Sequence, residues 1–299
     1  MAAGSHVILN GELLPRGEAR LGVDDLGFLV GDGVFETLRL YGGVPFLLEE
    51  HIARLFASLR LIGLEVPWTR DQLLAQVRLL VEHNALQFGS GRLRITVTRG
   101  PGAPPASPRG GPTLLVTADP YEPPDALVYE RGVHVETSRD ARHPTRWHRV
   151  KSTSHQANLL LRRQASSERV FEVLQWNDQG HLAEGSSTNV FMVDADGVLR
   201  TPHPREGCLK GVTRNAVLTI VGQSDIRHHE GEVTRELFAG AREIFLTSSL
   251  VELVPVRRLD GNSVGETCPG SLTLVLRAAY QSFVRSVVGG RGPGDPEIA

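Results

Sequence analysis

Apolar residues in this 299-residue chain follow two different periods, and segments of the two kinds are interleaved without strict alternation. Residues 33–40 and 91–99 alternate apolar and polar side chains, which is the spacing of a half-buried β-strand. Residues 49–62 and 71–86 instead repeat apolar side chains at helical intervals. A doubly wound sheet needs a helix after each strand, so the irregular order predicts an α+β fold.

A proline-rich stretch at residues 119–124 (DPYEPP) is the strongest candidate for a linker. The length of the chain fits two domains of moderate size. We therefore predict a small N-terminal α+β domain over residues 1–118, a linker over 119–126 and a large C-terminal domain over 127–288. Residues 289–299 (GGRGPGDPEIA) are rich in glycine and proline and are expected to form a disordered tail.

The charge and composition of the chain are those of an ordinary globular protein. A net charge of -2 at pH 7 gives no reason to expect nucleic acid or an anionic membrane as a partner. No apolar run approaches the ~20 residues that span a bilayer, and the first ten residues lack the features of a signal peptide. Neither the cysteines, Cys208 and Cys268, nor the histidines show a metal-binding pattern. We expect a cytoplasmic protein without a bound metal.

Lysine is scarce in this sequence. Of the 32 lysine and arginine residues only Lys151 and Lys210 are lysines. A reaction that needs an amine is confined to these side chains or the N-terminus, because a guanidinium is not a nucleophile near neutral pH. Lys151 precedes a helix expected at about residues 154–166, where a cation is unfavourable, and small polar residues follow it. These features fit either a surface lysine or a functional lysine in a pocket.

Three further segments have the residue types of a cofactor or anion site. Glu184 opens the segment EGSSTNVF; such a carboxylate can pair with the pyridine nitrogen of pyridoxal 5'-phosphate (PLP) or lie on a surface turn. Residues 207–213 (GCLKGVT) lead into a predicted helix, and they can form an anion site or an ordinary cap by Thr213. Residues 247–249 (TSS) follow a predicted strand and form either a hydroxyl cluster with a function or a plain turn.

Taken in order, these segments resemble the fold-type IV PLP enzymes, which include branched-chain and D-amino acid aminotransferases and aminodeoxychorismate lyase. The resemblance covers nearly the whole chain, from about residue 6 to residue 287, and it implies a two-domain PLP fold and a homodimer. It is carried by GFL at 27–29, GDGVFETLRLYGG at 31–43, PFLLEEHIARL at 45–55, VKS at 150–152, EGSSTNVF at 184–191, TP at 201–202, GCLKGVTR at 207–214 and IFLTSSLVELVPV at 244–256.

The resemblance also implies which residues bind the cofactor. Lys151 is implied to bind PLP as a Schiff base and then to move the substrate proton, and Glu184 is implied to pair with the pyridine nitrogen. The other implied contacts are Arg54, Val212, Thr213 and Ser249 at the phosphate, Ser248 nearby, and Leu209 against the ring.

The residues that bind the substrate differ among these enzymes. The Arg-x-His element of D-amino acid aminotransferases is absent here, and Gln156 stands where branched-chain enzymes typically have a tyrosine. The segment FETLR resembles the lyase, in which a threonine at the position of Thr37 assists proton transfer. Candidate substrate contacts are Phe35, Thr37, Arg39, Arg92 and Arg94, with the arginines as alternatives for binding a carboxylate.

We therefore predict a PLP-dependent aminotransferase that moves an amino group between an amino acid, of D- or branched-chain type, and a 2-keto acid by a ping-pong mechanism. One alternative is aminodeoxychorismate lyase, which releases pyruvate and leaves p-aminobenzoate. Another is a PLP-binding module without catalysis. The expected partners are these small molecules and a second copy of the chain, not nucleic acid or a membrane.

Overall fold

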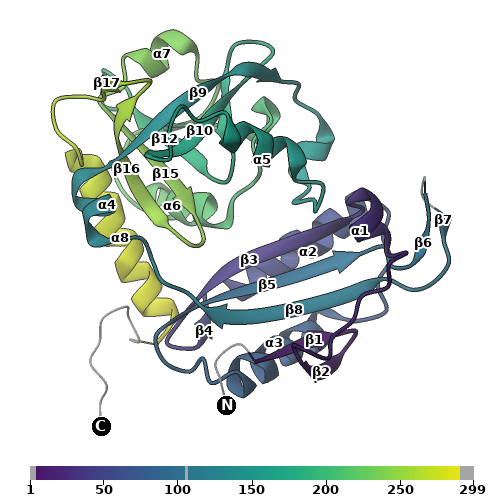
Figure 1. Ribbon diagram of the computed structural model, residues 1–299. Coiled ribbons are helices and arrows are strands. Elements are labelled where there is room, and N and C mark those ends of the chain that lie inside the picture. Colours follow the sequence, from purple (N-terminus) through teal and green to yellow (C-terminus); the bar gives the residue numbers. More distant parts are fainter. Residues whose placement is uncertain (1–4, 105–106, 290–299) are drawn as a thin grey trace. The chain divides into compact units, whose positions relative to one another are not determined.

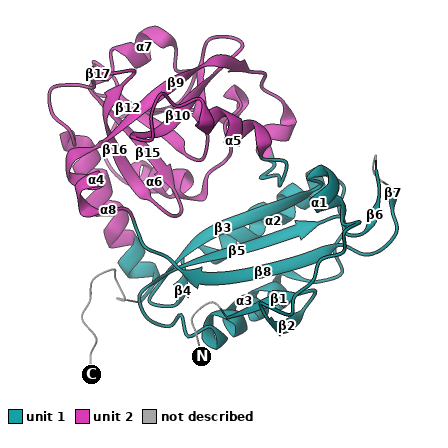
Figure 2. Ribbon diagram, in the orientation of Figure 1, with its two compact units in different colours: residues 1–123, 150–155, 284–299 teal, residues 124–149, 156–283 magenta. Residues whose placement is uncertain are grey.

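The computed structural model describes residues 5–104 and 107–289, and the chain divides into two compact units (Figure 2). Unit 1 contains the described residues up to Pro123, together with Val150–His155 and residues 284–289. Unit 2 contains Pro124–Arg149 and Gln156–Phe283. The boundary after Pro123 falls inside the segment for which we predict a linker. Of the predicted tail, residues 290–299 lie outside the described residues.

One segment groups with a different unit from the one that the sequence suggests. The sequence places Val150–His155 in the second domain, but its backbone pairs with the start of strand β3 (Gly33–Tyr41) in unit 1. The amide of Phe35 donates to the carbonyl of Lys151, and the amide of Thr153 donates to the carbonyl of Gly33, each at 2.9 Å. These partners are far apart in the sequence, so no local pattern indicates the pairing.

Unit 1 is built on a six-stranded sheet in the order β2-β1-β8-β5-β3-β4, in which each neighbouring pair is antiparallel (Figure 1). β3 and β5 pair along their full length, from Gly33 opposite Thr98 to Tyr41 opposite Ser90. Besides β3, the strands are β1 (His6–Leu9), β2 (Glu12–Pro15), β4 (Val44–Pro45), β5 (Ser90–Thr98) and β8 (Thr113–Pro120), and a separate pair is formed by β6 (Gly102–Ala103) and β7 (Ser107–Pro108).

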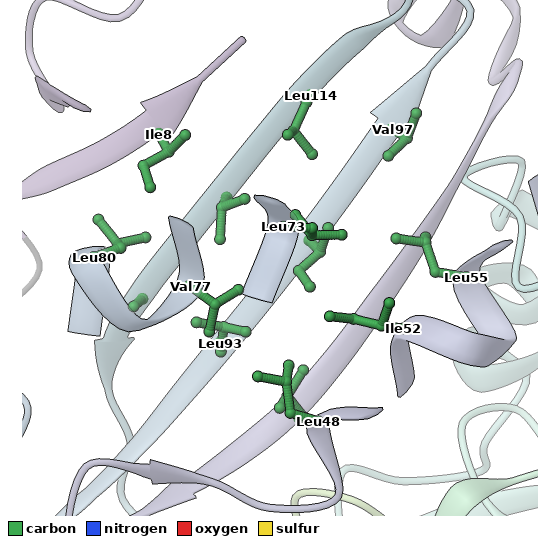
Figure 3. Packing of buried hydrophobic residues seen from close by; sticks show 14 of the residues in the cluster. Ile8, Leu48, Ile52, Leu55, Leu73, Val77, Leu80, Leu93, Val97 and Leu114 are labelled. Atoms are coloured by element: carbon green, nitrogen blue, oxygen red, sulfur yellow. The ribbon is translucent and has the colours of Figure 1, made fainter. Parts of the chain in front are cut away.

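Helices α2 (Leu48–Leu61) and α3 (Arg70–His83) cover one face of this sheet, and the short helix α1 (Leu26–Val30) precedes β3 (Figure 1). Apolar side chains from α2 and α3 pack against alternate positions of the strands. Because burying this apolar surface is the main favourable contribution to folding, the interface is the core of unit 1. Figure 3 shows the packing of Ile8, Leu48, Ile52, Leu55, Leu73, Val77, Leu80, Leu93, Val97 and Leu114.

Unit 2 contains a nine-stranded mixed sheet in the order β11-β10-β9-β16-β15-β12-β13-β14, with β17 paired to β16. β9 is parallel to β10 and β16, β13 is parallel to β14, and the other pairs are antiparallel. The strands are β9 (Val133–Arg142), β10 (Val170–Asn177), β11 (Leu182–Gly185), β12 (Asn189–Val193), β13 (Leu199–Pro202), β14 (His228–Gly231), β15 (Glu243–Ser248), β16 (Glu252–Leu259) and β17 (Asn262–Ser263).

The helices of unit 2 join these strands. They are α4 (Ala126–Arg131), the 3₁₀ turns η1 (Arg146–Arg149) and η2 (Pro204–Glu206), α5 (Gln156–Arg163), α6 (Val212–Gly222), α7 (Arg235–Ala239) and α8 (Ser271–Val287), whose last residues group with unit 1. Parallel and antiparallel pairs in one sheet, with helices inserted irregularly, confirm the predicted α+β class. In the part of the chain that the structure describes, no helix is both long and apolar enough to cross a membrane.

Candidate active site

The backbone around Lys151 is fixed by β3. Besides the two amide bonds to Gly33 and Phe35, the hydroxyl of Thr153 donates to the carbonyl of Gly31 at 2.7 Å. Gly31 has a φ of 70°, which a glycine adopts without strain. A Cβ on Gly33 would lie 2.6 Å from the carbonyl oxygen of Val97, so a side chain there would push the strands apart. The glycines of the GDG segment therefore permit the close approach that holds Lys151.

The side chain of Phe35 brings two cations together. The Nζ atom of Lys151 lies 4.6 Å from the centre of its ring, and the guanidinium carbon of Arg94 lies 3.9 Å from it. The aromatic face attracts both cations. Burial, and to a smaller extent the charge of Arg92, lowers the pKa of Arg94. An anion bound beside Arg94 would compensate for both effects.

The three candidate arginines have different surroundings. Arg39 is 3% exposed, donates to the hydroxyl of Ser90 and packs on Tyr41, so its guanidinium is held by contacts within unit 1. Arg92 has a side chain that is 48% exposed and lies 3.9 Å from a carboxylate oxygen of Asp119. Arg94 is half-buried and, among the described residues, has no carboxylate within ion-pair distance; its Nε donates to the hydroxyl of Thr96.

The register of the sheet also places Thr37 on the open face. Thr37 is opposite Arg94, and Phe35 is opposite Thr96. Side chains two residues apart on a strand share a face, so these four residues share the face that carries the Lys151 amine. Phe35, Thr37 and Arg94 are therefore neighbours, on a face that by the same alternation also carries Arg39 and Arg92.

Arg54 is held by a buried carboxylate that the sequence analysis did not single out. Glu36 is fully buried; its two oxygens accept from Nε and Nη2 of Arg54 at 2.8 and 2.6 Å, and one of them also contacts Nδ1 of His51 at 2.7 Å. Burial raises the pKa of Glu36, but the charge and hydrogen bonds of Arg54 and His51 outweigh it and lower this pKa to about 2. Burial also lowers the pKa of His51. Glu36 therefore fixes the orientation of Arg54.

In unit 2, Glu184 is a buried carboxylate with three partners. Its Oε1 accepts from Nη1 of Arg142 at 2.5 Å, and its Oε2 accepts from the amide of Leu209 at 2.8 Å and from Nδ2 of Asn189 at 3.4 Å. The same Arg142 nitrogen donates to the carbonyl of Gly207 at 2.9 Å. Because a guanidinium and a backbone amide both face Glu184, its negative charge is stabilised and its position is fixed.

The loop after Glu184 is organised by a second buried carboxylate. Glu172 is 1% exposed and accepts hydrogen bonds from the amides and hydroxyls of Ser186 and Ser187 and from the hydroxyl of Thr188. A Cβ on Gly185 would lie 2.7 Å from Cγ of Glu172, so the glycine leaves room for this side chain. The small polar run of EGSSTNVF is thus a set of donors to Glu172 rather than a surface turn.

The N-terminus of α6 has the properties of an anion site. The N-cap is Gly211, which has no side chain to cap the helix, and Val212 and Thr213 are buried in its first turn. The alternative in which Thr213 is an ordinary cap does not apply, because Thr213 lies inside the helix. A Cβ on Gly211 would lie 1.9 Å from Oδ1 of Asn189, so a side chain there would have to displace the Asn189 amide. The first-turn N–H groups, which have no carbonyl partner within the helix, and the helix dipole favour a bound phosphate.

The remaining implied cofactor residues lie in unit 2. Leu209 directs its backbone amide to Glu184 and its carbonyl to Asn189. Ser248 ends β15 opposite Glu252, and Ser249 follows in the turn; both are partly buried. An amine on a fixed backbone, a carboxylate paired with a guanidinium and a helix N-terminus without a side-chain cap are the donor set that suits the aldehyde, the ring nitrogen and the phosphate of PLP. The residues present therefore fit this cofactor.

Another cluster, His181 with Glu206 and Glu232, has ligand types that a metal ion could use. Nδ1 of His181 is already hydrogen bonded to Glu206 at 2.9 Å, and Asn177 donates to the same carboxylate oxygen. Glu232 has a side chain that is 68% exposed. The cluster is explained by hydrogen bonds and ion pairs, and we assign no metal to it.

Sequence analysis missed Glu36, Glu172, Arg142 and Asn189. A signal existed for the two glutamates, because each occupies a position in the apolar phase of a strand: Glu36 lies between the buried Val34 and Leu38 in alternation. A charge at such a position needs a buried partner. Arg142 and Asn189 carry no such signal, since their contacts depend on tertiary structure.

Comparison with known proteins supports the resemblance. The family model described as amino-transferase class IV matches residues 33–259. The D-alanine aminotransferase of Bacillus licheniformis is 34% identical over 284 residues, which are 94% of this chain and 97% of that protein. A putative branched-chain-amino-acid aminotransferase of Methanocaldococcus jannaschii is 33% identical over 281 residues, 93% of this chain and 96% of that protein. Among solved structures, the PLP-bound form of a hypothetical aminotransferase from Mycobacterium tuberculosis has a TM-score of 0.80 and 25% identity, and the match covers 94% of this chain and 99% of that one.

Proposed function

Because this chain belongs to the class IV aminotransferases, a family that uses PLP, we propose that Lys151 is the residue that binds the cofactor and moves the substrate proton. The observation that carries this assignment is the position of Lys151. Its backbone is hydrogen bonded to β3, and its Nζ lies near the ring of Phe35, which the guanidinium of Arg94 also contacts. Lys210, the other lysine, follows Leu209 in the loop before α6.

The chemistry of the proposed reaction divides among a few groups. PLP, when bound, supplies a conjugated ring that withdraws electrons from the substrate α-carbon. Nζ of Lys151 takes the proton from that carbon and returns it after the electrons have been redistributed. The carboxylate of Glu184 accepts a hydrogen bond from the protonated ring nitrogen and keeps the proton there. Arg142 holds Glu184 in place for this task.

We propose further that the remaining implied residues bind the phosphate and the ring. Val212 and Thr213 donate from the first turn of α6 through backbone N–H groups and the Thr213 hydroxyl, Ser249 and Arg54 supply further donors, and Ser248 lies nearby. Leu209 packs against the ring. The uncapped N-terminus of α6 supports the phosphate assignment, and the carboxylate that orients Arg54 supports a fixed role for that guanidinium.

Arg94 is our candidate for binding the substrate carboxylate. Replacing it with glutamine should raise the KM for the amino acid about 10- to 100-fold, because a charge-assisted hydrogen bond contributes about 1.5–3 kcal/mol. We expect a smaller change in kcat, since the proton-transfer residues remain. Steady-state kinetics measure both constants. Arg92→Gln is the matched control, because this exposed side chain lies on the same strand; an equal rise in KM for both variants would contradict the assignment.

The substrates proposed for the chain are a D- or branched-chain amino acid and a 2-keto acid, in a ping-pong reaction. The names of the relatives support this class, and those names do not favour the lyase. The test is to mix the PLP-loaded protein with single L- and D-amino acids and to measure the keto acid that each one releases. At least one amino acid should release about one equivalent per site, and a second keto acid should restore the starting state.

The same assay separates the alternatives. If no amino acid released keto acid while aminodeoxychorismate yielded pyruvate and p-aminobenzoate, the lyase would replace the aminotransferase as the proposed function. Thr37, on the same sheet face as Phe35 and Arg94, is the residue that the lyase would use. If neither reaction occurred, a binding module would remain.

We also propose that the chain forms a homodimer and works in the cytoplasm. The resemblance implies the dimer, and large exposed apolar side chains at Val23 (83%) and Phe28 (76%) are compatible with a surface that a second copy covers. Light scattering should give the mass of two 32.6-kDa chains, and a fully active species of one chain would contradict the dimer. Cell fractionation tests the compartment.

A further inference from the structure

The hydroxyl of Thr247 is buried and has no hydrogen-bond partner among the residues that the structure describes. Thr247 lies on β15 and is 1% exposed. A buried hydroxyl without a partner loses the hydrogen bonds that it makes with water in the unfolded chain, so such groups are uncommon in native structures. The position therefore calls for an explanation.

The register of the sheet locates this hydroxyl. Thr247 is directly opposite Asn189 on β12, and residues opposite each other in an antiparallel pair project from the same face. On the next pair along that face, Phe191 and Phe245 stack at 5.0 Å. The neighbouring positions Val190 and Leu246 project from the other face into the core of unit 2.

Asn189 connects this face to α6. Its Oδ1 occupies the space beside Gly211, the N-cap of α6, where a Cβ would lie 1.9 Å from it. Thr247 is thus adjacent to the residue that contacts the helix N-terminus, on the same face. Two independent observations meet there: a helix of 11 residues without a side-chain cap, and a buried hydroxyl for which the described residues offer no partner.

We propose that the Thr247 hydroxyl donates a hydrogen bond to the phosphate that the N-terminus of α6 binds. This inference rests on the proposed function, in which that phosphate belongs to PLP. It adds a residue to those that the resemblance implies for the cofactor. That set includes Ser248 and Ser249 of the TSS segment but not Thr247. Strand alternation turns Ser248 to the opposite face from Thr247, so the two hydroxyls have different surroundings.

The test compares apoprotein affinities for PLP and for pyridoxal, which lacks the phosphate. In Thr247→Val a methyl group replaces the hydroxyl at nearly constant volume. The affinity for PLP should fall on the order of tenfold, because a hydrogen bond to an anion is lost, while the affinity for pyridoxal stays unchanged. Inorganic phosphate should compete less well with PLP in the variant. The melting temperature of the apoprotein should be unchanged or higher, because an unsatisfied polar atom has been removed.

Thr247→Ser keeps the hydroxyl and should retain most of the preference for PLP over pyridoxal. If the valine variant does not fold, Thr247→Ala serves for the same comparison. Thr201→Val is the matched control: this threonine is also 1% exposed, and its hydroxyl donates to the carbonyl of Val190 at 2.8 Å. The control should lower the melting temperature and leave the ratio of the two affinities as it is.

The outcomes distinguish the inference from the function on which it rests. If wild-type apoprotein bound PLP no better than pyridoxal, the phosphate site itself would be wrong, and the inference with it. If the wild type preferred PLP and Thr247→Val kept the whole preference, only the role of Thr247 would be wrong. A parallel loss of both affinities, with a lower melting temperature, would show a structural role and would also overturn the inference.

Discussion

Replacement of Lys151 by alanine is expected to abolish the covalent link to PLP and to slow amino-group transfer by at least about 10⁴-fold, since the variant loses both the attachment point and the general base. Guanidinium groups cannot substitute, and the other lysine side chain, Lys210, lies in the loop before α6. Borohydride reduction of the PLP-loaded protein, followed by mass spectrometry of its peptides, shows which lysine is modified. The turnover rate is measured in parallel.

Lys210→Met is the matched control for this experiment. It removes the other lysine amine and should leave both the label on Lys151 and most of the activity. The assignment would be wrong if Lys151→Ala protein carried the reduced label on Lys210 and retained turnover. If instead only the Lys210→Met protein lost the label, the cofactor would be assigned to Lys210 rather than to Lys151.

Replacement of Glu184 by glutamine should slow proton removal from the substrate by about 2–4 kcal/mol in activation free energy, while PLP stays bound. The neutral amide cannot keep a proton on the ring nitrogen by its charge. It also turns an NH₂ group toward either Arg142 or the amide of Leu209, both of which are donors. Single-turnover rates with an α-deuterated amino acid isolate the proton step.

The control for Glu184 is another buried carboxylate of unit 2. The side chain of Glu206 accepts from Asn177 and contacts His181, neither of which is proposed to bind PLP. Glu206→Gln should change the melting temperature but not the single-turnover rate. If Glu184→Gln turned over at the wild-type rate, its carboxylate would have to be reassigned to a structural role.

Periodicity predicted the long elements of the small unit well, because each buries one continuous face. The alternation at 33–40 and 91–99 corresponds to β3 and β5, and the helical spacing at 49–62 and 71–86 corresponds to α2 and α3. It did not reveal that Val150–His155 groups with unit 1. That placement depends on backbone hydrogen bonds to β3, which leave no mark on side-chain spacing.

For the candidate site too, some features were predictable from the sequence and others were not. The order of short motifs was enough to identify the family, because those motifs contain glycines and small residues that the backbone geometry requires, such as Gly33, Gly185 and Gly211. The partners that orient the functional groups were not evident. Arg142 reaches Glu184 from another strand, and the choice of Arg94 over the other two arginines required knowledge of what surrounds each guanidinium in the folded chain.

The attachment of Lys151 to β3 has a consequence for engineering. The two flanking segments, residues 143–149 and 156–163, are held by other contacts, whereas the lysine backbone is fixed by backbone hydrogen bonds to β3 of the unit 1 sheet. Amide exchange at Thr153, whose N–H donates to β3, should therefore be as slow as at residues inside β3. Changes in the two flanking segments should therefore leave the position of the Lys151 backbone on β3 unchanged.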